Sequence, residues 1–452
     1  MSKFRSKKSN LQTFKETKRQ VPEGTQVLSI VEQLDDGRGV AKFKGKIVFV
    51  DGALKGETVK VQFKKSFKNF DEATSVKIIS PVSDRIQPQC QYYERCGGCN
   101  LQHMKLQAQR TFKQKSIEKR MVEFGLVKND ELESVISPLL TSDPFQYRHR
   151  ARFSVEANSH KFVLGFKGNN SNKVVDIDSC EVLLPGLNTV LPKLRLSMSG
   201  LSYRSSIREI LILEDSNGKA FIQIRSNKRL ADRDVDSLKV LSDRENIGIS
   251  CKNLVDQMTY WSSDDTQPLT QLSNESVSYN YSLDDFTQIN PTINEKMIQQ
   301  TCEWLDLSEE DHVIDLFCGI GNFSLPAAKN VKGMTGYEIS EKMVKKAAQN
   351  AKENGLSNTT FFAVDLFSHS LKFDRHVNKL ILDPPRAGAE HVCAQLVPPR
   401  IQYILYISCN PSSFFRDSKI LIDGGYVIDK LGLIDMFPQT EHVEIMALFS
   451  HQ

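Results

Sequence analysis

The chain has 452 residues, of which 40% are hydrophobic and 25% charged, and its formal net charge is +4. At about 150 residues per domain this length predicts roughly three domains, each able to bury a core. No apolar run approaches the roughly 20 residues that span a bilayer, which excludes a membrane-spanning helix. The first residues also lack the apolar centre of a signal peptide, so we expect a cytoplasmic protein with no membrane partner.

The positive charge is concentrated at the amino end. Residues 1–20 carry seven Lys or Arg and one Glu, a charge of +6, so the rest of the chain stands at −2. A basic stretch with few large apolar residues is typical of a disordered extension. Two later stretches, 60–68 (KVQFKKSFK) and 147–152 (YRHRAR), place aromatic residues among basic ones, as stacking on single-stranded RNA would require. The tail is therefore either a solvated extension or an RNA-binding arm.

Residues 21–80 alternate short β-rich runs with glycine turns, which predicts a small all-β barrel. The turns are DDGRG and DGALKGE, and the runs are VLSIVEQL, VAKFKGKIVFV, TVKVQF and ATSVKII. The stretch resembles the TRAM domain, an OB-like RNA-binding barrel of RNA-modifying enzymes, although Lys55 stands where that family often has proline. The resemblance implies an RNA-binding module. A barrel without a ligand is the alternative, because a fold does not fix a function.

Four cysteines form a pattern typical of a metal site. Cys90, Cys96 and Cys99 lie within CQYYERCGGCNLQHM, and Cys180 follows after a gap of 80 residues. Four thiolates can bind zinc or an iron–sulfur cluster, and spacing alone does not decide between them. The pattern after a TRAM-like barrel resembles the [4Fe-4S] site of RNA uracil-C5 methyltransferases, so the resemblance favours iron and sulfur. We expect the surrounding segment, 81–285, to be an α/β domain with strands such as REILILED and KAFIQIRS.

The last third of the chain has the pattern of a doubly wound α/β sheet. HVIDLFCGIGNFSLPAAK predicts a strand, a glycine turn and the start of a helix. Gly319 and Gly321 let the backbone approach a ligand, but Ser324 replaces the third glycine of the dinucleotide fingerprint, which disfavours a nicotinamide cofactor. Ser340 and Gly355 are expected to cap the helix that follows the next strand.

Four acidic residues end or follow successive predicted strands: Asp315 in HVIDLF, Glu338 in GMTGYEIS, Asp365 in FFAVDLF and Asp383 in LILDPPR. Ligands of open α/β sheets bind outside the carboxyl ends of the strands. At such an end, a carboxylate such as Glu338 can accept hydrogen bonds from both hydroxyls of a ribose. Together the four positions resemble the S-adenosylmethionine pocket of Rossmann-like methyltransferases, over about residues 286–452.

LILDPPR also resembles the Asp-Pro-Pro motif of adenine-N6 and glutamine methyltransferases. Those enzymes usually carry an aromatic residue after the prolines, where this chain has Arg386, and they need no nucleophilic cysteine. Cys409, in YISCNP at the end of a predicted strand, therefore favours a different reaction.

Carbon 5 of uracil is a poor nucleophile, so its methylation requires prior addition of a thiolate to carbon 6. Cys409 can supply that thiolate, which is nucleophilic enough for covalent catalysis. A base must then remove the proton from carbon 5 so that the thiolate can leave. TEHVEIMALF offers Glu444 at the start of an apolar strand, with Glu441 three residues earlier.

SCNP and EHVE resemble the two catalytic signatures of RNA (uracil-5-)-methyltransferases, and with the barrel and the cysteines the resemblance covers nearly the whole chain. It implies that Cys409 is the nucleophile, that Glu444 is the base and that S-adenosyl-L-methionine donates the methyl group. It also implies a cofactor pocket made by six residues, which are Gln288, Phe317, Asn322, Glu338, Asp365 and Asp383.

The barrel and the cysteines favour 23S ribosomal RNA as substrate, because the enzyme that acts on the T-loop of transfer RNA typically lacks both. An RNA-binding or ribosome-assembly protein without activity is the alternative from another class, but it would have no need for Cys409 and Glu444. The target nucleotide, the oligomeric state and any obligate protein partner are not encoded, because unpaired bases are read by shape and stacking. The predicted parts are the tail 1–20, the TRAM-like barrel 21–80, the central domain 81–285 and the methyltransferase domain 286–452.

Overall fold

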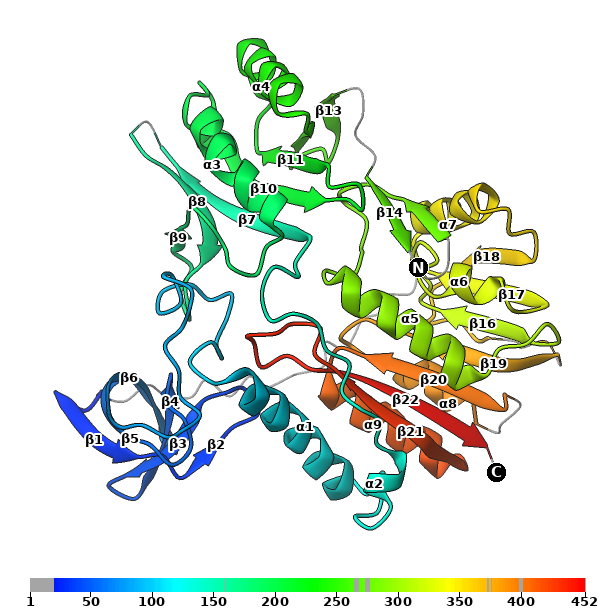
Figure 1. Ribbon diagram of the computed structural model, residues 1–452, viewed down its shortest axis with the longest axis horizontal. Coiled ribbons are helices and arrows are strands. Elements are labelled where there is room, and N and C mark those ends of the chain that lie inside the picture. The colour runs from blue at the N-terminus through cyan, green and yellow to red at the C-terminus, as the bar shows by residue number, and fades with distance from the viewer. Residues whose placement is uncertain are drawn as a thin grey trace, which may run out of the picture. The chain divides into compact units, whose positions relative to one another are not determined.

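The computed structural model describes residues 20–158, 160–263, 268–272, 277–371, 374, 376–397 and 401–451 (Figure 1). These residues form two compact units. Unit 1 contains the described residues up to Gln87 together with His103–Lys105, and unit 2 contains Pro88–Gln102 and the described residues from Leu106 onward. The basic tail lies outside the described residues, apart from Gln20. Within the described ranges, no helix combines the length and the apolar character needed to cross a membrane.

Unit 1 is a six-stranded sheet in the order β1-β5-β6-β4-β3-β2, antiparallel except where β4 pairs with β6. Along β5 the side chains alternate, with Val59, Val61 and Phe63 buried and Lys60 and Lys64 exposed, as a pleated strand over a core requires. The all-β structure predicted for this region is confirmed. The strands are β1 (Thr25–Ser29), β2 (Glu32–Gln33), β3 (Gly39–Phe43), β4 (Lys46–Asp51), β5 (Thr58–Ser66) and β6 (Phe70–Ser80).

The first sheet of unit 2 has seven strands in the order β13-β12-β11-β10-β7-β8-β9. The predicted strands REILILED and KAFIQIRS are its antiparallel neighbours β10 and β11. Helices α3 and α4 pack against it through buried leucines, whereas Leu196 of α3 is exposed. The elements are β7 (Arg150–Ala157), β8 (Phe162–Lys167), β9 (Val174–Asp176), α3 (Pro185–Ser199), the 3-10 helix Arg204–Ser206, β10 (Ile207–Glu214), β11 (Ala220–Ser226), α4 (Asp232–Glu245), β12 (Gly248–Asn253) and β13 (Thr259–Ser262).

The second large sheet of unit 2 has the order β18-β17-β16-β19-β20-β22-β21. Its first five strands in this order are parallel, and β22 is antiparallel to both β20 and β21. The strands are β16 (His312–Leu316), β17 (Gly333–Glu338), β18 (Thr359–Ala363), β19 (Val377–Leu382), β20 (Tyr403–Ser408), β21 (Tyr426–Ile434) and β22 (Glu444–His451). A separate hairpin pairs β14 (Leu269–Leu272) with β15 (Val277–Asn280).

Helices cover both faces of this second sheet (Figure 1). One face packs against α5, α6 and α7, and the other against α1, α8 and α9. Parallel strands buried on both sides read as continuous apolar runs, which is the pattern of HVIDL and YILYIS. The helices are α1 (Leu106–Glu123), α2 (Leu132–Val135), α5 (Pro291–Leu305), α6 (Ser324–Ala328), α7 (Glu341–Glu353), α8 (Glu390–Gln395) and α9 (Pro411–Asp423).

The predicted caps of α7 are confirmed. The Ser340 side chain accepts a hydrogen bond from the backbone N–H of Met343, which satisfies one free donor of the first turn. Gly355 has φ +71°, the left-handed conformation that ends a helix without a Cβ clash. The helix therefore begins and ends where its sequence specifies, and it fixes the loop after β17.

The order of the second sheet contains a topological switch point. The chain proceeds from β16 to β17 and β18 on one side and then to β19 and β20 on the other. Connections leave β16 and β19 in opposite directions, so a crevice opens between their carboxyl ends, and ligands bind there in open α/β sheets.

Candidate active site

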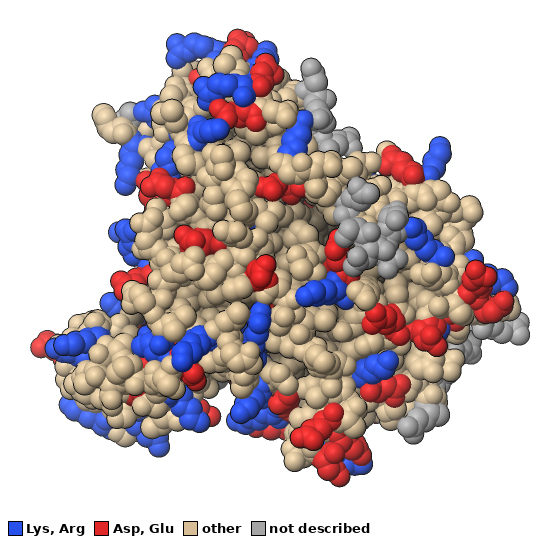
Figure 2. Space-filling model, viewed as in Figure 1, with Lys and Arg blue, Asp and Glu red and all other residues tan. Residues whose placement is uncertain are grey.

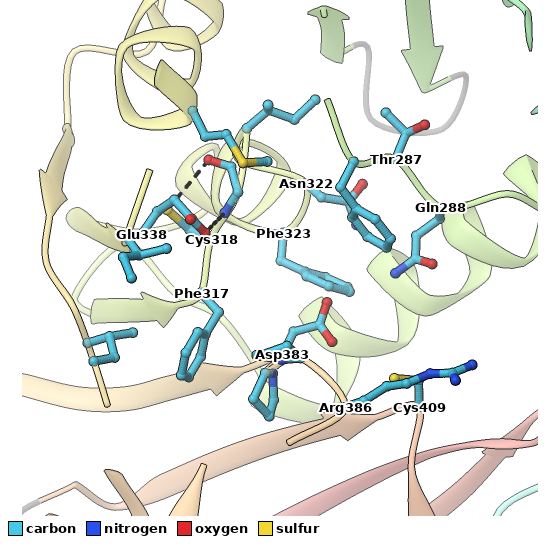
Figure 3. A pocket seen from close by; sticks show the side chains of 18 of the residues that line it. Thr287, Gln288, Phe317, Cys318, Asn322, Phe323, Glu338, Asp383, Arg386 and Cys409 are labelled. Carbon is cyan, nitrogen blue, oxygen red and sulfur yellow. Dashed lines mark hydrogen bonds between the residues drawn. The ribbon is translucent and has the colours of Figure 1, made fainter. Parts of the chain in front are cut away.

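A cavity of about 560 Å³ opens at this edge of the sheet (Figure 3). Its walls come from the segment before α5, the carboxyl ends of the five strands β16 to β20 and the start of β22. In Figure 3, Asp383 lies between Glu338 on one side and Arg386 with Cys409 on the other. Seven of the predicted catalytic and cofactor residues line the cavity, and these are Gln288, Phe317, Asn322, Glu338, Asp383, Cys409 and Glu444.

The turn after β16 brings both backbone and side chains, among them Phe317 and Asn322, to the cavity. Phe317, Gly319 and Gly321 all have positive φ, at +66°, +57° and +95°. A Cβ on Gly321 would lie 2.8 Å from Cγ of Leu325, so this position requires glycine for packing as well as conformation. The turn leaves room for a ligand against the amino end of the following segment.

Two carboxylates support that turn. Glu338 accepts the N–H of Gly319 at 3.3 Å and that of Ser340 at 3.0 Å, and its side chain still lines the cavity. Asp315 is fully buried and accepts a hydrogen bond from Ser324 Oγ, while its Oδ1 has no partner among the described residues. The pKa of Asp315 is raised to about 7, chiefly by burial and in part by the nearby Asp383 and Glu338. The serine that replaces the third fingerprint glycine thus bonds a buried carboxyl group.

Asp365 occupies a different position from the other predicted pocket residues. It is exposed, and its carboxylate accepts the N–H of Phe367 at 3.0 Å and the hydroxyl of Ser368 at 2.7 Å. Its neighbours Val364 and Leu366 line the cavity instead. Asp365 therefore caps the turn after β18, and its contact with a cofactor stays a prediction.

Cys409 and Glu444 meet because β20 and β22 are antiparallel neighbours. Ser408 at the end of β20 pairs with Ile445. One further step along both strands sets Cys409 opposite Glu444, the first residue of β22. A thiol and a carboxyl group that are far apart in the sequence therefore face the same cavity.

The residues around the thiol fix its backbone. Asn410 is the N-cap of α9, its Oδ1 accepting from the N–H of Ser412 at 3.1 Å. Its Nδ2 donates to the backbone carbonyl of Arg386 at 2.8 Å, which ties the segment after β20 to the one after β19. Pro411 takes the first helical position, where its missing N–H costs nothing. Each residue of CNP after the cysteine therefore has a structural role of its own.

The Cys409 thiol and two carboxyl groups near it, those of Asp383 and Glu444, all have pKa values raised above their ordinary values. Burial raises the pKa of Glu444 to about 7, although Arg386 opposes the effect. Burial raises the pKa of Asp383 to about 8, and Glu444 adds to it. The pKa of the Cys409 thiol is raised by burial and by both carboxyl groups, and lowered by Arg386. Glu444 can therefore exchange a proton near neutral pH, which general acid–base catalysis requires.

Several lining residues were not assigned to the site from sequence. Arg386 follows the two prolines of LDPPR, and His442 lies within EHVE, so both stand in motifs that were recognised for other residues. Phe286 is 66% exposed and lines the cavity, a combination that sequence patterning does not reveal. Glu441, the alternative base, is not among the lining residues of the described chain; its N–H donates to Asn100 Oδ1 at 3.0 Å.

The four predicted cluster ligands all lie in unit 2 and are partly buried. The pKa of Cys99 is raised to about 12 and that of Cys180 to about 11, chiefly by burial and in part by the nearby Cys96 and Cys90. The thiols therefore share one environment although Cys180 is remote in sequence. No group of three or more Cys, His, Asp or Glu residues in the described part of the chain is arranged to hold a metal ion.

The two internal basic stretches differ from expectation. Phe63 is buried in the core of unit 1, and Phe67 packs on Phe70 with ring centroids 4.7 Å apart. In the second stretch Tyr147 and His149 are buried. The prediction that these interleaved aromatic residues stack on RNA is therefore wrong for Phe63 and Tyr147, because both serve packing.

Comparison with known proteins adds to this geometry. A family model described as tRNA (Uracil-5-)-methyltransferase matches residues 107–452. The 23S rRNA (uracil(1939)-C(5))-methyltransferases RlmD of Shewanella sediminis and of Shewanella sp. strain ANA-3 are each 38% identical to the chain, over 93% of its length and 94% of theirs. The structure of Pyrococcus abyssi tRNA (uracil-54, C5)-methyltransferase in complex with S-adenosyl-L-homocysteine matches with a TM-score of 0.73 and 22% identity, covering 93% of this chain and 99% of that one. This structural likeness shows a common fold.

Proposed function

Because the chain belongs to the tRNA (uracil-5-)-methyltransferase family, we propose that it methylates carbon 5 of a uridine in 23S ribosomal RNA. The observation that carries this proposal is the presence of both Cys409 and Glu444 in the lining of one cavity, next to the paired residues Ser408 and Ile445. The choice of ribosomal RNA rests on relatives at 38% identity that carry the name of 23S rRNA methyltransferases.

The reaction begins at the thiol. Sγ of Cys409 adds to carbon 6, and the electrons of the carbon 5–carbon 6 double bond move toward the carbonyl at carbon 4, giving an enolate. When bound, S-adenosyl-L-methionine would supply an electrophilic methyl group to carbon 5, with its sulfur–methyl bond breaking and S-adenosyl-L-homocysteine leaving. Glu444 then removes the proton from carbon 5, the double bond re-forms, and the bond between sulfur and carbon 6 breaks. Arg386 assists ionisation of the thiol, since it lowers the pKa of Cys409.

The cofactor fits the other half of the cavity. Glu338 lies at the end of β17, where a carboxylate can accept from ribose hydroxyls, and the glycine turn provides close backbone approach. Gln288, Phe317, Asn322 and Asp383 line the same space. Asp365 accepts two hydrogen bonds within its turn, which leaves acceptor capacity on its carboxylate for a ligand.

The cysteine site is proposed to bind a [4Fe-4S] cluster. Cys90, Cys96, Cys99 and Cys180 share a partly buried environment, and thiolates are the ligands that such clusters use.

Unit 1 is proposed to be a TRAM-like RNA-binding module that works with the catalytic unit in the cytoplasm. Figure 2 shows Lys and Arg side chains gathered over the strands of unit 1, with few acidic side chains among them on this face. Basic surfaces bind RNA phosphates without reading sequence. The exposed lysines of unit 1 are Lys42, Lys44, Lys55, Lys60, Lys64, Lys65, Lys68, Lys77 and Lys105.

Mass spectrometry of ribosomal and transfer RNA from a strain lacking the gene tests the proposal. Loss of one 5-methyluridine from 23S ribosomal RNA is the expected result, and a plasmid copy should restore it while a Cys409→Ala copy should not. Loss of the T-loop methyl group instead would establish transfer RNA as the substrate. Unchanged methylation of both RNAs would leave only the RNA-binding alternative.

A further inference from the structure

The segment between β21 and β22 contains a turn at Gln439, where the backbone conformation is unfavourable for a residue with a side chain. Gln439 has φ +71°, a conformation that side chains other than glycine rarely adopt, and it is buried. The same segment supplies Phe437, His442 and Glu444 to the cavity. A strained turn at a site persists only where its surroundings hold it in place.

The segment from Cys90 to Leu101, called the cysteine loop here, is hydrogen-bonded to this turn. The N–H groups of Asn100 and Leu101 both donate to the carbonyl oxygen of Gln439, at 3.1 and 3.0 Å. Oδ1 of Asn100 accepts in return from the N–H of Glu441 at 3.0 Å. Asn100 and Leu101 directly follow Cys99, so a residue adjacent to a predicted cluster ligand is hydrogen-bonded to the turn.

A side chain from α1 locks the two segments together. Nε2 of Gln109 donates to the carbonyl of Leu101 and to Oε1 of Gln439, both at 3.0 Å. Its Oε1 accepts from the N–H of Gln439 at 3.2 Å. Gln109 and Gln439 are both buried, and a buried polar group must be paired, so these bonds admit one arrangement of the turn.

Further contacts fix the rest of the segment. The hydroxyl of Tyr147 donates to the carbonyl of Pro438 at 3.1 Å. The buried Lys113 binds Oδ1 of Asp435 at 2.6 Å and the carbonyl of Phe437 at 3.2 Å. These bonds anchor the segment from outside the cysteine loop, so loss of the loop's bonds should shift the turn without unfolding it.

We propose that Asn100 and Gln109 are positioning residues for Glu444, and that the cysteine loop acts on the base through the turn at Gln439. The proposal rests on the proposed role of Glu444 as the base. The thiol Cys409 lies between β20, which ends at Ser408, and α9, which starts at Pro411, and the hydrogen bonds described above do not involve it. Displacing the turn should therefore slow removal of the carbon 5 proton while leaving addition of the thiol intact.

The test separates these two steps. In Asn100→Ala and Gln109→Ala, denaturing gels should show the covalent protein–RNA adduct forming at the rate of the unaltered enzyme but resolving about ten- to hundredfold more slowly, because small misplacements of a catalytic group have large costs. Asn100→Asp keeps the acceptor for the N–H of Glu441 and should resolve faster than Asn100→Ala. Resolution at the unaltered rate in both alanine variants would overturn the proposal.

Asn378→Ala is the matched control. Oδ1 of Asn378 also accepts a backbone N–H, that of His312 at 3.2 Å, but at the amino end of β19 on the far side of the sheet from the cavity. It should leave the ratio of adduct formation to resolution unchanged. A change equal to that in Asn100→Ala would mean that the effect is general destabilisation, and would contradict the proposal.

Amide hydrogen exchange gives a readout that does not depend on catalysis. Exchange at Glu441 should be faster in Asn100→Ala, and in full-length protein whose cysteine site has been stripped of iron by a chelator, with iron and sulfide content measured alongside. Unchanged exchange in both samples would refute the coupling. If neither the unaltered enzyme nor Glu444→Gln forms any adduct while exchange does change, the proposed function fails and the coupling stands.

Discussion

At the scale of single residues, the surroundings of Cys409 oppose the ionisation of the thiol that its proposed reaction requires. Burial, Glu444 and Asp383 all favour the neutral thiol, whereas addition to carbon 6 requires a thiolate. Arg386 is the group at the site that lowers the pKa of Cys409, and it lowers that of Glu444 as well. The same residue therefore helps both the nucleophile and the base to ionise.

Substitution of the two catalytic groups should have different consequences. Cys409→Ala should bind S-adenosyl-L-methionine but lose methylation by about 10³-fold or more, without forming an adduct, since a lost nucleophile stops the reaction before the covalent bond. Glu444→Gln should add and transfer methyl but accumulate an adduct that survives denaturation, because elimination needs the base. Denaturing electrophoresis of labelled RNA separates the two results.

Glu441→Gln is the control for the base. Its side chain is not among the residues that line the cavity, so this variant should turn over without accumulating adduct. An adduct in Glu441→Gln but not in Glu444→Gln would move the role of base to Glu441. Methylation retained in Cys409→Ala would favour an amino-group methyltransferase built on LDPPR.

The pH dependence of adduct resolution follows from Glu444. Its pKa is raised to about 7 by burial, so the reactive carboxylate grows with pH below that value and is saturated above it. The rate of resolution should rise about tenfold per pH unit below pH 7 and then level off. Arg386→Gln should move the midpoint to higher pH, because Arg386 lowers this pKa. A midpoint near the ordinary glutamate value in single-turnover decay would contradict the assignment.

Sequence predicted the residue types at the site better than their surroundings. The acidic strand ends were expected; Glu338 and Asp383 line the cavity, whereas Asp315 is fully buried and bonded to Ser324. Exposed or buried placement was not predictable for Phe63 and Tyr147, because an aromatic residue among lysines fits both a core position and an RNA-stacking surface. Only the register of the strands decides between the two.

At the scale of elements, local signals were reliable and pairings were not. The caps of α7 were predictable because N-cap and C-cap chemistry is local to a few residues. The antiparallel insertion of β22 between β20 and β21 was not predictable, because an apolar run in the sequence does not determine which strands will pair with it. That insertion brings Glu444 to Cys409.

The proposed [4Fe-4S] cluster of the cysteine loop can be tested directly. Anaerobically purified protein should be brown and contain iron and sulfide, because four thiolates gather in one partly buried environment. Cys180→Ser should lose most of the iron, whereas the buried Cys251, in the core of the first sheet of unit 2, can be changed to Ser as a control that keeps it. Stoichiometric zinc without sulfide would refute the cluster.

At the scale of the whole molecule, charge and chemistry belong to different parts of the chain. The catalytic cavity lies in unit 2, whereas exposed lysines cover unit 1 and the first 20 residues carry +6. Drawing one base out of a structured RNA costs a few kcal/mol, so contacts away from the reacting base must contribute to binding.

Deletion of residues 1–20 should therefore weaken RNA binding without affecting cofactor binding. Each phosphate contact with single strands contributes about −0.7 to the slope of log affinity against log salt, so loss of several basic residues should flatten the slope by one or more units. The affinity for S-adenosyl-L-methionine, measured by calorimetry, should not change, because the proposed cofactor residues, such as Gln288, Glu338 and Asp383, belong to unit 2. Replacing the seven Lys and Arg of the tail with Gln should reproduce the deletion, since charge is the property that matters. An unchanged salt slope in both variants would show that the tail does not contact RNA.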